Sequence, residues 1–323
     1  MDSAYLLATL QSVVASSSPL VFAGIGETLT ERSGVTNLSL DGTILLSAMA
    51  GFAVAYRTHS LVLGFAAGAL VGAAIALIVA FGSIALRQDQ VAVGFTLTLL
   101  CADLSAFIGL HYVHIPGPNV PHWAIPGLAD IPVIGQVLFD QNIVVYGSYL
   151  VVLLAWFWLR FTQQGLRLRS VGERPEAAFS RGIPVNRLRY VYSALGGGLV
   201  GVAGASYSLC VKLGWSNNHT AGMGWIALAI VIFGSWSPLK VMLGAYLFGL
   251  LKALGSMMQP VYPNVPTQVF QSAPFALMLL ALVLVGGGGA WIERLVPARL
   301  RPAVLAILGS APPAGLGKRF EQV

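Results

Sequence analysis

The sequence predicts an all-α polytopic membrane protein, and three observations lead to that fold class. Only 9% of the 323 residues are charged and 56% are hydrophobic, whereas about 25% of the residues of an ordinary soluble domain are charged. The apolar residues are collected in runs close to the length of about 20 residues that a membrane-spanning helix needs. Between two of these runs lies the basic loop, residues 160–189, with seven arginines and two acids. So few charges cannot cover a soluble surface of this size.

Nine apolar runs predict about nine transmembrane helices (8–10), some of them short or broken. In chain order they are Leu6–Gly26, Leu40–Tyr56, Leu61–Leu86, Val91–Val113, Ile143–Leu159, Tyr190–Val211, Met223–Phe233, Val241–Met257 and Phe270–Val285. Met223–Phe233 is the shortest and is a candidate half-helix. The runs form a single transmembrane domain over residues 1–293, and a basic tail follows over residues 294–323.

Two glycine patterns indicate close packing between helices. Gly64, Gly68 and Gly72 recur every fourth residue, and Gly197 and Gly201 repeat the same spacing. Small residues at this spacing let helix backbones approach each other in a membrane. A glycine-lined pore is the alternative interpretation.

The basic loop orients the chain, because cytoplasmic loops carry an excess of lysine and arginine. With the basic loop inside, His111–Asp140 lies outside and has no lysine or arginine, and Glu27–Leu40 lies inside. The basic tail is then cytoplasmic and the N-terminus external, while Arg57 is a minor violation of the rule. Topology thus accounts for the net charge of +6 without a nucleic-acid partner.

The centre of the basic loop has the pattern of a short helix. Pro175 suits the first helical position, Glu176 follows in the first turn, and Gly182 suits the position just past the end. A helix of about two turns is therefore expected between two membrane spans. Such a helix is suited to insertion into the groove of a partner. A solvated loop is the alternative, and composition leaves both open.

The run GLRLRSVGERPEAAFSRGIPVNRLRYVYSALGGGLVGVAGASYSL resembles the cytoplasmic loop and following helix of permease subunits from bacterial ABC importers. The similarity is to the simple-sugar and nucleoside branch of a branched-chain-permease-like family, whose pattern this chain matches at Gly165, Arg167, Arg169, Val171, Gly172, Pro175, Ala177, Ala178, Gly182 and Ile183. Gly24–Phe52 resembles the N-terminal motif of this family, and Gly224–Leu251 resembles its C-terminal motif. The similarity covers roughly residues 8 to 290.

This resemblance implies a type II-like ABC importer permease in the bacterial cytoplasmic (inner) membrane, surrounded by lipid. Its implied partners are ABC ATPase subunits, a second homologous permease and an extracytoplasmic binding protein that delivers nucleosides or related simple-sugar-like solutes. The permease itself is then not an enzyme and holds no cofactor, because ATP and Mg²⁺ belong to the ATPase. The short chain resembles one subunit of the heterodimeric nucleoside permeases, so we favour a heterodimer over a homodimer.

The resemblance further implies that Glu173–Ile183 is a coupling helix that contacts the ATPase. The residues assigned to this contact are Arg169, Gly172, Glu173, Pro175, Glu176, Ala177, Ala178 and Gly182.

A polar interruption in an apolar region marks a candidate translocation path. Asn37, Ser39 and Asp41 lie among glycines between two apolar runs. Irregular backbone at membrane depth occurs where it faces protein or a water-filled cavity, and broken helices build transport sites. An ordinary cytoplasmic turn is the alternative.

Two further polar residues are candidates for the same path. Asp103 lies in the middle of an apolar run, where a carboxylate is costly. It could instead pair with a helix partner, or serve as the ion site of a secondary transporter. Asn217 lies outside the membrane, before the shortest run, where a solvated loop is the bland interpretation.

Other chemistries are disfavoured. A membrane enzyme would need paired acids, a nucleophile triad or a metal cluster, and the sequence has none of these on one side of the bilayer. His111, His114 and His122 lack an acidic or cysteine partner at ligand spacing. The two cysteines lie in apolar runs and are expected to pack there. Gly315–Lys318 departs from the phosphate-binding loop, so no nucleotide site is expected.

Overall fold

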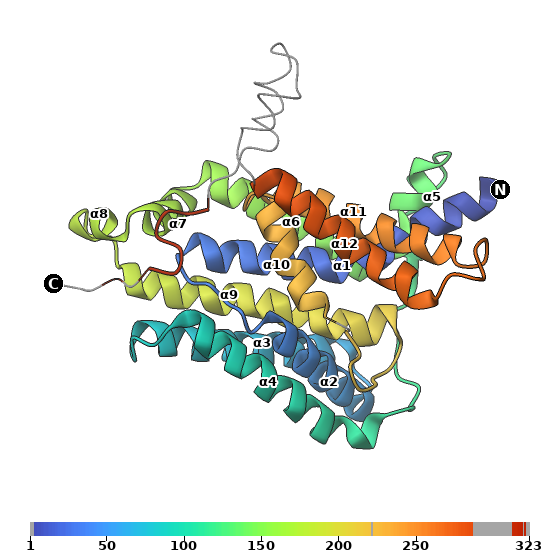
Figure 1. Cartoon of the computed structure of the whole chain (residues 1–323), viewed down its shortest axis with the longest axis horizontal. Coiled ribbons are helices and arrows are strands. Elements are labelled where there is room, and N and C mark those ends of the chain that lie inside the picture. Colours follow the sequence, from blue (N-terminus) through green and yellow to red (C-terminus); the bar gives the residue numbers. More distant parts are fainter. Residues whose placement is uncertain (1–2, 221, 287–311, 319, 321–323) are drawn as a thin grey trace, which may run out of the picture.

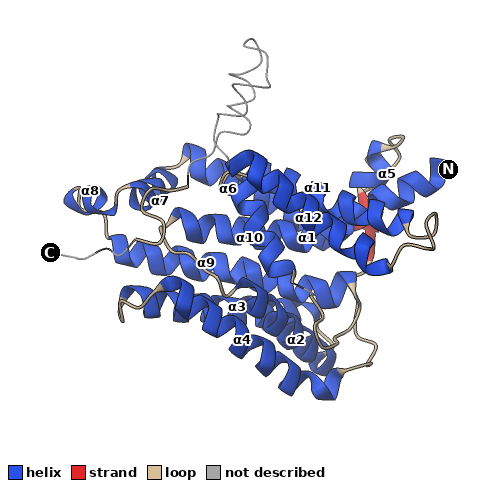
Figure 2. Ribbon diagram, viewed as in Figure 1, coloured by secondary structure: helices blue, strands red, loops and turns tan. Residues whose placement is uncertain are grey.

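The computed structural model describes residues 3–220, 222–286, 312–318 and 320, which form a bundle of helices (Figures 1 and 2). Each of the nine predicted apolar runs forms a helix. They are α1 (Ser3–Arg32), α2 (Leu40–Thr58), α3 (Leu61–Ile84), α4 (Gln90–Gly109), α6 (Ile143–Phe161), α9 (Val185–Ser206), α10 (Met223–Phe233), α11 (Pro238–Met258) and α12 (Thr267–Gly286). A five-residue π-helical turn, η2 (Tyr207–Val211), extends α9.

Six helices within the described residues are long and apolar enough to cross a membrane. These spans are Ala4–Arg32, Leu61–Ile84, Gln90–Tyr112, Ile143–Phe161, Val185–Val211 and Pro238–Met258. At 11 residues α10 is too short to cross a bilayer alone, as expected of a half-helix. The protein is therefore multi-pass, and the count of nine crossings stays a prediction.

The first helix is longer than its sequence pattern predicts. It continues past Gly26 to Arg32, so the first six residues of the segment Glu27–Leu40 are helical, and the side of the membrane on which this segment lies stays a prediction. Glu27 is fully buried and Glu31 nearly so. Both carboxylates have hydrogen-bond donors inside the bundle, which allows the helix to carry them without interruption. Only residues 33–39 link α1 to α2.

Glycines bring α3 and α9 into close contact, in agreement with the close helix packing that their spacing predicts. A Cβ atom at Gly72 would lie 2.7 Å from the Cα of Gly201, and one at Gly197 would lie 3.1 Å from the carbonyl carbon of Gly72. Real side chains are not accommodated at these distances, so α3 and α9 touch through their backbones. The packing interpretation of both glycine patterns is confirmed at these residues, because their Cα faces point at the neighbouring helix.

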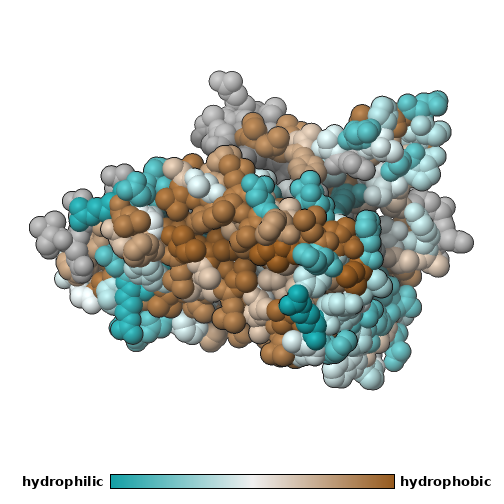
Figure 3. Space-filling view, turned by 90° about the horizontal axis from the view of Figure 1, so that it is seen from below, coloured by the Kyte–Doolittle hydropathy of each residue, from teal (hydrophilic) through white to brown (hydrophobic). Residues whose placement is uncertain are grey.

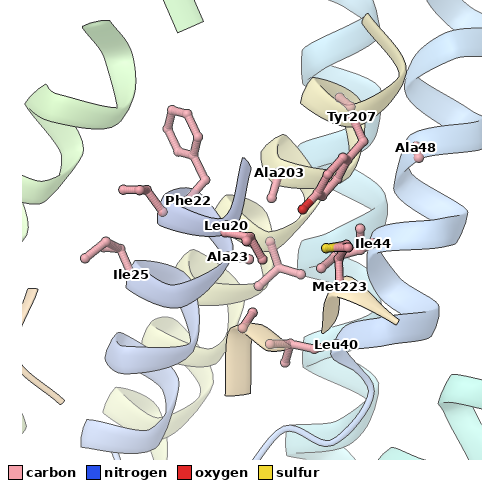
Figure 4. Close-up of a cluster of buried hydrophobic side chains, with 14 of the residues drawn as sticks. Leu20, Phe22, Ala23, Ile25, Leu40, Ile44, Ala48, Ala203, Tyr207 and Met223 are labelled. Carbon is pink, nitrogen blue, oxygen red and sulfur yellow. The ribbon is translucent and has the colours of Figure 1, made fainter. Parts of the chain in front are cut away.

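The core lies where α1, α2, α9 and α10 meet (Figure 4). Ile25, Leu40, Ile44 and Tyr207 are buried there among aliphatic side chains. Large apolar side chains also point outward, and Figure 3 shows hydrophobic residues over the middle of one face with hydrophilic residues toward its ends. Phe107 on α4, for example, is 73% exposed. An apolar outer surface of this kind is stable against lipid.

The segment between α4 and α6 is more structured than an all-α fold requires. It contains a 3-10 turn η1 (Leu110–Tyr112), the strands β1 (His122–Ala124) and β2 (Asp140–Asn142), and a short helix α5 (Ile134–Leu138). The strands pair antiparallel with His122 opposite Asn142. The hairpin brings His122 into contact with Asp140, an acidic neighbour that sequence spacing did not indicate. Three-residue strands are too short to leave an alternating pattern, which is why the sequence did not predict them.

Candidate functional site

Two short helices project from one end of the bundle, at the left of Figure 1. They are α7 (Gln163–Glu173) and α8 (Pro175–Ser180). The Thr162 hydroxyl caps α7 by accepting a hydrogen bond from the Gly165 N–H at 3.0 Å. Pro175 opens α8, and Gly182 follows its end with a φ of +77°, a left-handed conformation that glycine adopts without strain. The predicted short helix is confirmed at these bounds.

The faces of α8 differ in burial. Ala178 and Pro175 are buried, and Ala178 packs with Val171 of α7 and Val185 of α9. Glu176 and Ala177 are exposed on the other side. A shallow cavity of about 340 Å³ adjoins this face, with Arg174 and Arg181 among its lining residues. The exposed face of α8 is thus available to a partner, whereas the buried face is held by its own chain.

The eight residues predicted to contact an ATPase fall into three groups. Glu173, Glu176, Ala177 and Gly182 are exposed, Arg169 is half-buried, and Gly172, Pro175 and Ala178 are buried. The buried residues support the helix rather than presenting a surface. A Cβ atom at Gly172 would collide with the carbonyl of Arg32 at the end of α1, so α7 touches α1 directly at that point.

The end of the chain lies against the same region. The Ala314 N–H donates to the Glu173 carboxylate at 3.2 Å, and the Gly317 N–H donates to the Gly34 carbonyl at 3.2 Å. The Phe320 ring meets the Phe179 ring edge-on, with centroids 5.7 Å apart. Sequence reasoning missed this tail segment, residues 312–320, because it had no apolar run. The remaining basic residues of the tail lie outside the described residues, apart from Lys318.

A buried polar junction links α1 to α2. Residues 33–39 are non-helical and mostly buried. The Asn37 N–H donates to the Glu27 carboxylate at 3.1 Å, and the Ser39 hydroxyl donates to the Asn37 side-chain oxygen at 2.6 Å. The predicted interruption is therefore a real break between two helices. It lies inside the protein rather than on its surface, so an ordinary solvated turn does not describe it.

Several other helices hold the junction in place. The Asp41 carboxylate accepts a hydrogen bond from the Gly224 N–H at 3.0 Å, which ties α2 to the start of α10. The Thr98 hydroxyl of α4 donates to the Leu38 carbonyl at 2.8 Å. Asn37, Ser39 and Asp41 are thus brought together, and α4 and α10 both bind to the segment that carries them.

A second set of contacts joins the junction to the end that carries α7 and α8. The indole N–H of Trp236, in the turn between α10 and α11, donates to Glu31. The Arg32 guanidinium donates to the Trp236 carbonyl at 2.9 Å, and the Arg189 guanidinium donates to the Ser33 carbonyl at 3.2 Å. The ends of α1, α9 and α10 are therefore connected through polar contacts.

The two other predicted path residues lie elsewhere. Asp103 is exposed on α4 and does not reach the junction, and Asn217 is exposed in the loop before α10. Sequence reasoning did not single out Glu27 or His219 as buried polar residues. Glu27 stands four residues before Glu31, so both share one face of an apolar helix. That spacing was the available signal.

His219 lies in the buried part of the loop before α10, close to the described end opposite α8. Its ring nitrogen Nε2 is 3.3 Å from the Ser208 hydroxyl, and the Lys212 ammonium donates to its backbone carbonyl. Burial and the neighbouring Lys212 charge lower the pKa of His219 to about 4. The imidazole is therefore neutral at pH 7 and does not add to the positive charge of Lys212.

A multi-pass bundle with an apolar exterior, a buried polar link between α1 and α2 and a short helix projecting at one end is typical of a membrane permease. The chain belongs to the family described as branched-chain amino acid transport system / permease component, which matches residues 9–286. Members of this family are transporter components and not enzymes. As a member of the family, this chain is likewise a transporter component and not an enzyme.

Relatives in several organisms match most of the chain. The nucleoside ABC transporter permease protein NupC of Lactococcus lactis is 35% identical over 85% of this chain and 92% of its own length. The guanosine ABC transporter permease protein NupQ of Bacillus subtilis is 34% identical over 87% of this chain and 93% of its own length. TsgC13 of Haloferax volcanii, which is named as a glucose ABC transporter permease protein, is 38% identical over 80% of each chain.

The fold is similar to that of a solved transporter. A metal-chelate type ABC transporter in an inward-facing conformation superposes with a TM-score of 0.50 and 16% sequence identity, covering 85% of this chain and 84% of that chain. At this identity the likeness concerns the fold alone, and it agrees with the predicted permease architecture.

Proposed function

We propose that the chain is the transmembrane permease subunit of an ATP-driven importer. The single observation that carries this proposal is α8, a capped helix at one end of the bundle whose exposed face bears Glu176 and Ala177. Separate ATPase subunits bind ATP and Mg²⁺ and dock on this face, so the chain needs no nucleotide site of its own. The coupling surface comprises α8 and the exposed residues beside it, with Gly172, Pro175 and Ala178 holding it in place.

The cargo consists of nucleosides or related simple-sugar-like solutes. The names of three relatives, which give nucleosides, guanosine and glucose, support this class. An extracytoplasmic binding protein delivers the solute. A second, homologous permease completes the membrane unit, and a heterodimer is favoured over a homodimer because the sequence resembles one subunit of the heterodimeric nucleoside permeases.

The orientation follows from the basic loop. Helices α7 and α8 and the tail over residues 294–323 are cytoplasmic, and the N-terminus is external, in a bacterial inner membrane. The arginines that flank α8 support this orientation, because cytoplasmic loops are enriched in basic residues. ATPase movement reaches the polar junction through two contacts, that of Gly172 with the end of α1 and that of Arg189 with Ser33. Asn37, Ser39 and Asp41 then line or gate the path, with Asp103 and Asn217 as outlying candidates.

The docking face is tested by placing a charge where the ATPase would contact it. Ala177 is exposed, so Ala177→Arg leaves the permease folded and is expected to abolish co-purification of the ATPase and ATP-driven uptake. Ala124→Arg, an exposed alanine in β1, is the matched control and is expected to behave as wild type. Normal co-purification and uptake with Ala177→Arg would refute the docking assignment. Ala178→Arg is a poorer test, because Ala178 is buried and the change would disturb internal packing.

An ion-coupled secondary transporter is the competing function, and Asp103 discriminates between the two. In that case Asp103→Asn would eliminate uptake driven by an ion gradient, and an uncoupler would inhibit the wild type. Uptake by an ATP-driven importer needs the ATPase and does not depend on an ion gradient, in the wild type or in the variant. The exposed position of Asp103 on α4, away from the junction, favours the importer.

A further inference from the structure

Two lysines lie toward the end of the bundle that is opposite α8. Lys212 follows η2, and Lys252 lies in the last two turns of α11. Helix α11 starts beside Trp236, which contacts Arg32 at the α7 end of α1, and it runs away from there. Lys252 also shares a cavity with Tyr5 and Thr9, near the start of α1. In the proposed orientation both lysines are on the outer side, where the positive-inside rule makes cations uncommon.

Both lysines line one cavity of about 600 Å³, which is the size of a small-ligand pocket. Its wall combines hydrogen-bonding side chains with aromatic rings, including Ser256, Gln259 and Phe248. Lys212 also lines a neighbouring cavity of about 510 Å³ with His114 and His219, and Lys252 lines a third of about 470 Å³ with Ser256. The cavity of about 600 Å³ therefore adjoins one neighbouring cavity at Lys212 and another at Lys252.

The charge of this region is not compensated by the protein. No aspartate or glutamate lines any of the three cavities among the described residues. The Lys212 ammonium donates to the His219 carbonyl, which carries no charge. The ammonium group has two further N–H groups that can donate to another acceptor. Within the part of the chain that the structure describes, Lys252 forms no ion pair. Partial burial and the charge of Lys252 lower the pKa of Lys212, in agreement with two ammonium groups that line one cavity.

Both lysines are exposed, and two cations that line one cavity without an acidic neighbour give it a positive potential, which attracts an acceptor of opposite charge. Neutral His219 adds no further cation, and the aromatic rings offer a surface on which a sugar or base can stack. The cavity is thus suited to a solute that has a polar ring and an acidic group. Both lysine side chains are exposed where they line this cavity, so a solute on that side can reach them.

We propose that the Lys212–Lys252 cavity is an oxyanion-binding subsite of the outer vestibule, which favours acidic members of the sugar-like cargo class, with a carboxylate or a phosphate between the two ammonium groups. The proposal rests on the proposed function in taking the bundle as a solute path. It goes beyond that function by naming the charge that the vestibule accepts.

The local charge can be measured without transport or ATPase. A single cysteine at Ser256, in the full chain with Cys101 and Cys210 replaced by serine, is labelled in membranes with an anionic or a cationic methanethiosulfonate. We expect the ratio of the labelling rate with the anionic reagent to that with the cationic reagent to be about tenfold higher than for a free thiol. The two nearby ammonium groups attract the anionic reagent and repel the cationic one. Lys212→Gln and Lys252→Gln are each expected to lower the ratio severalfold, while Lys252→Arg preserves it as the matched control.

Ligand class is tested by protection of the same cysteine from a neutral maleimide. Glucuronate is compared with glucose, and uridine monophosphate with uridine, so that the carboxylate and phosphate sources are separated. We expect the acidic member of at least one pair to slow labelling and its neutral partner to leave it unchanged, with protection lost in Lys212→Gln and Lys252→Gln.

An anionic-to-cationic ratio equal to that of the free thiol, or one that both lysine variants leave unchanged, would overturn the subsite. Equal protection by the acidic and neutral members of both pairs, or no protection by any of the four, would overturn it as well. Failure of ATP-driven uptake would contradict the proposed function and would leave these labelling results standing, because labelling requires only the folded chain in a membrane.

Discussion

The Gly315 N–H donates to the carbonyl of Gly172 at 2.7 Å and so joins the tail segment to the end of α7. Both glycines are buried, and a Cβ atom at Gly315 would lie 3.1 Å from Pro175, the first residue of α8. Gly172, whose carbonyl accepts this hydrogen bond, also contacts Arg32 at the end of α1. One backbone hydrogen bond therefore stands at the meeting point of the tail, the proposed docking helix and the helix that leads into the polar junction.

Loss of this hydrogen bond is expected to loosen the tail. Gly315→Pro removes the N–H donor, which costs about 1 kcal/mol or more when the acceptor stays buried. Hydrogen–deuterium exchange of residues 312–320 and of α8 should rise. Lys318→Ala is the control, because the Lys318 side chain is exposed and its contact with Arg189 is made by the backbone carbonyl. Unchanged exchange in Gly315→Pro would show that the tail does not depend on this contact.

Neighbouring glycines of α9 should differ sharply in their tolerance of a methyl group. Gly197→Ala forces α3 and α9 apart and is expected to destabilise the protein by about 1–3 kcal/mol. Gly198→Ala meets no atom closer than 3.8 Å and gains helix propensity, so its expected effect is neutral or slightly stabilising. Thermal unfolding in detergent compares the two. Equal melting temperatures would argue against direct backbone packing between α3 and α9.

The polar junction should be sensitive to loss of the Asn37 side chain. Asn37→Ala leaves the Ser39 N–H without its acceptor in a buried place, at a cost of about 1–3 kcal/mol, while the Ser39 hydroxyl keeps its contact with the Thr43 hydroxyl at 3.1 Å. Uptake should fall along with stability, because the break between α1 and α2 loses its internal support. Thr36→Ala serves as the control, since the Thr36 contact to Gln90 uses the backbone N–H. Equal losses in the two variants would contradict a specific role for Asn37.

Stability should depend on pH through His219. Its folded pKa, about 4, lies below the value of about 6.5 of an unfolded chain. The unfolded state therefore binds a proton first as the pH falls, and stability is lost between about pH 6.5 and pH 4. Above pH 6.5 this contribution is fully present. The difference in melting temperature between wild type and His219→Gln should narrow over that window, and a constant difference would exclude a buried, neutral His219.

Much of the fold could be predicted because its determinants are local in sequence. Long apolar runs with at most one charged residue are expected to lie in lipid or in a core, and each of the nine formed a helix. Pro175 and Gly182 mark the ends of α8 through their own backbone preferences, so its position was readable within a residue or two. The glycine spacing on α3 and α9 similarly predicted close contact between helices, although it did not indicate which helices would be in contact.

The candidate site could be predicted only in part. The sequence placed Asn37, Ser39 and Asp41 in a break, but it could not show that Glu27 continues the preceding helix while buried. Burial of that carboxylate depends on a donor ten residues away, whose position is set by the turn of the chain. The packing of the tail segment could not be predicted, because it depends on backbone hydrogen bonds and on contacts with residues far away in the sequence, such as Phe179.

The sequence by itself determined that this protein is a multi-pass bundle with a basic loop and a short capped helix, since hydrophobicity and backbone preference act over a few residues. Only the tertiary structure decided which face of α8 is exposed, that the tail packs beside it, and that Lys212 and Lys252 share a cavity. Those features depend on contacts between residues that are far apart in the sequence, in one case by more than a hundred positions. They depend on how the helices pack, and no local pattern records the partner that a residue will meet.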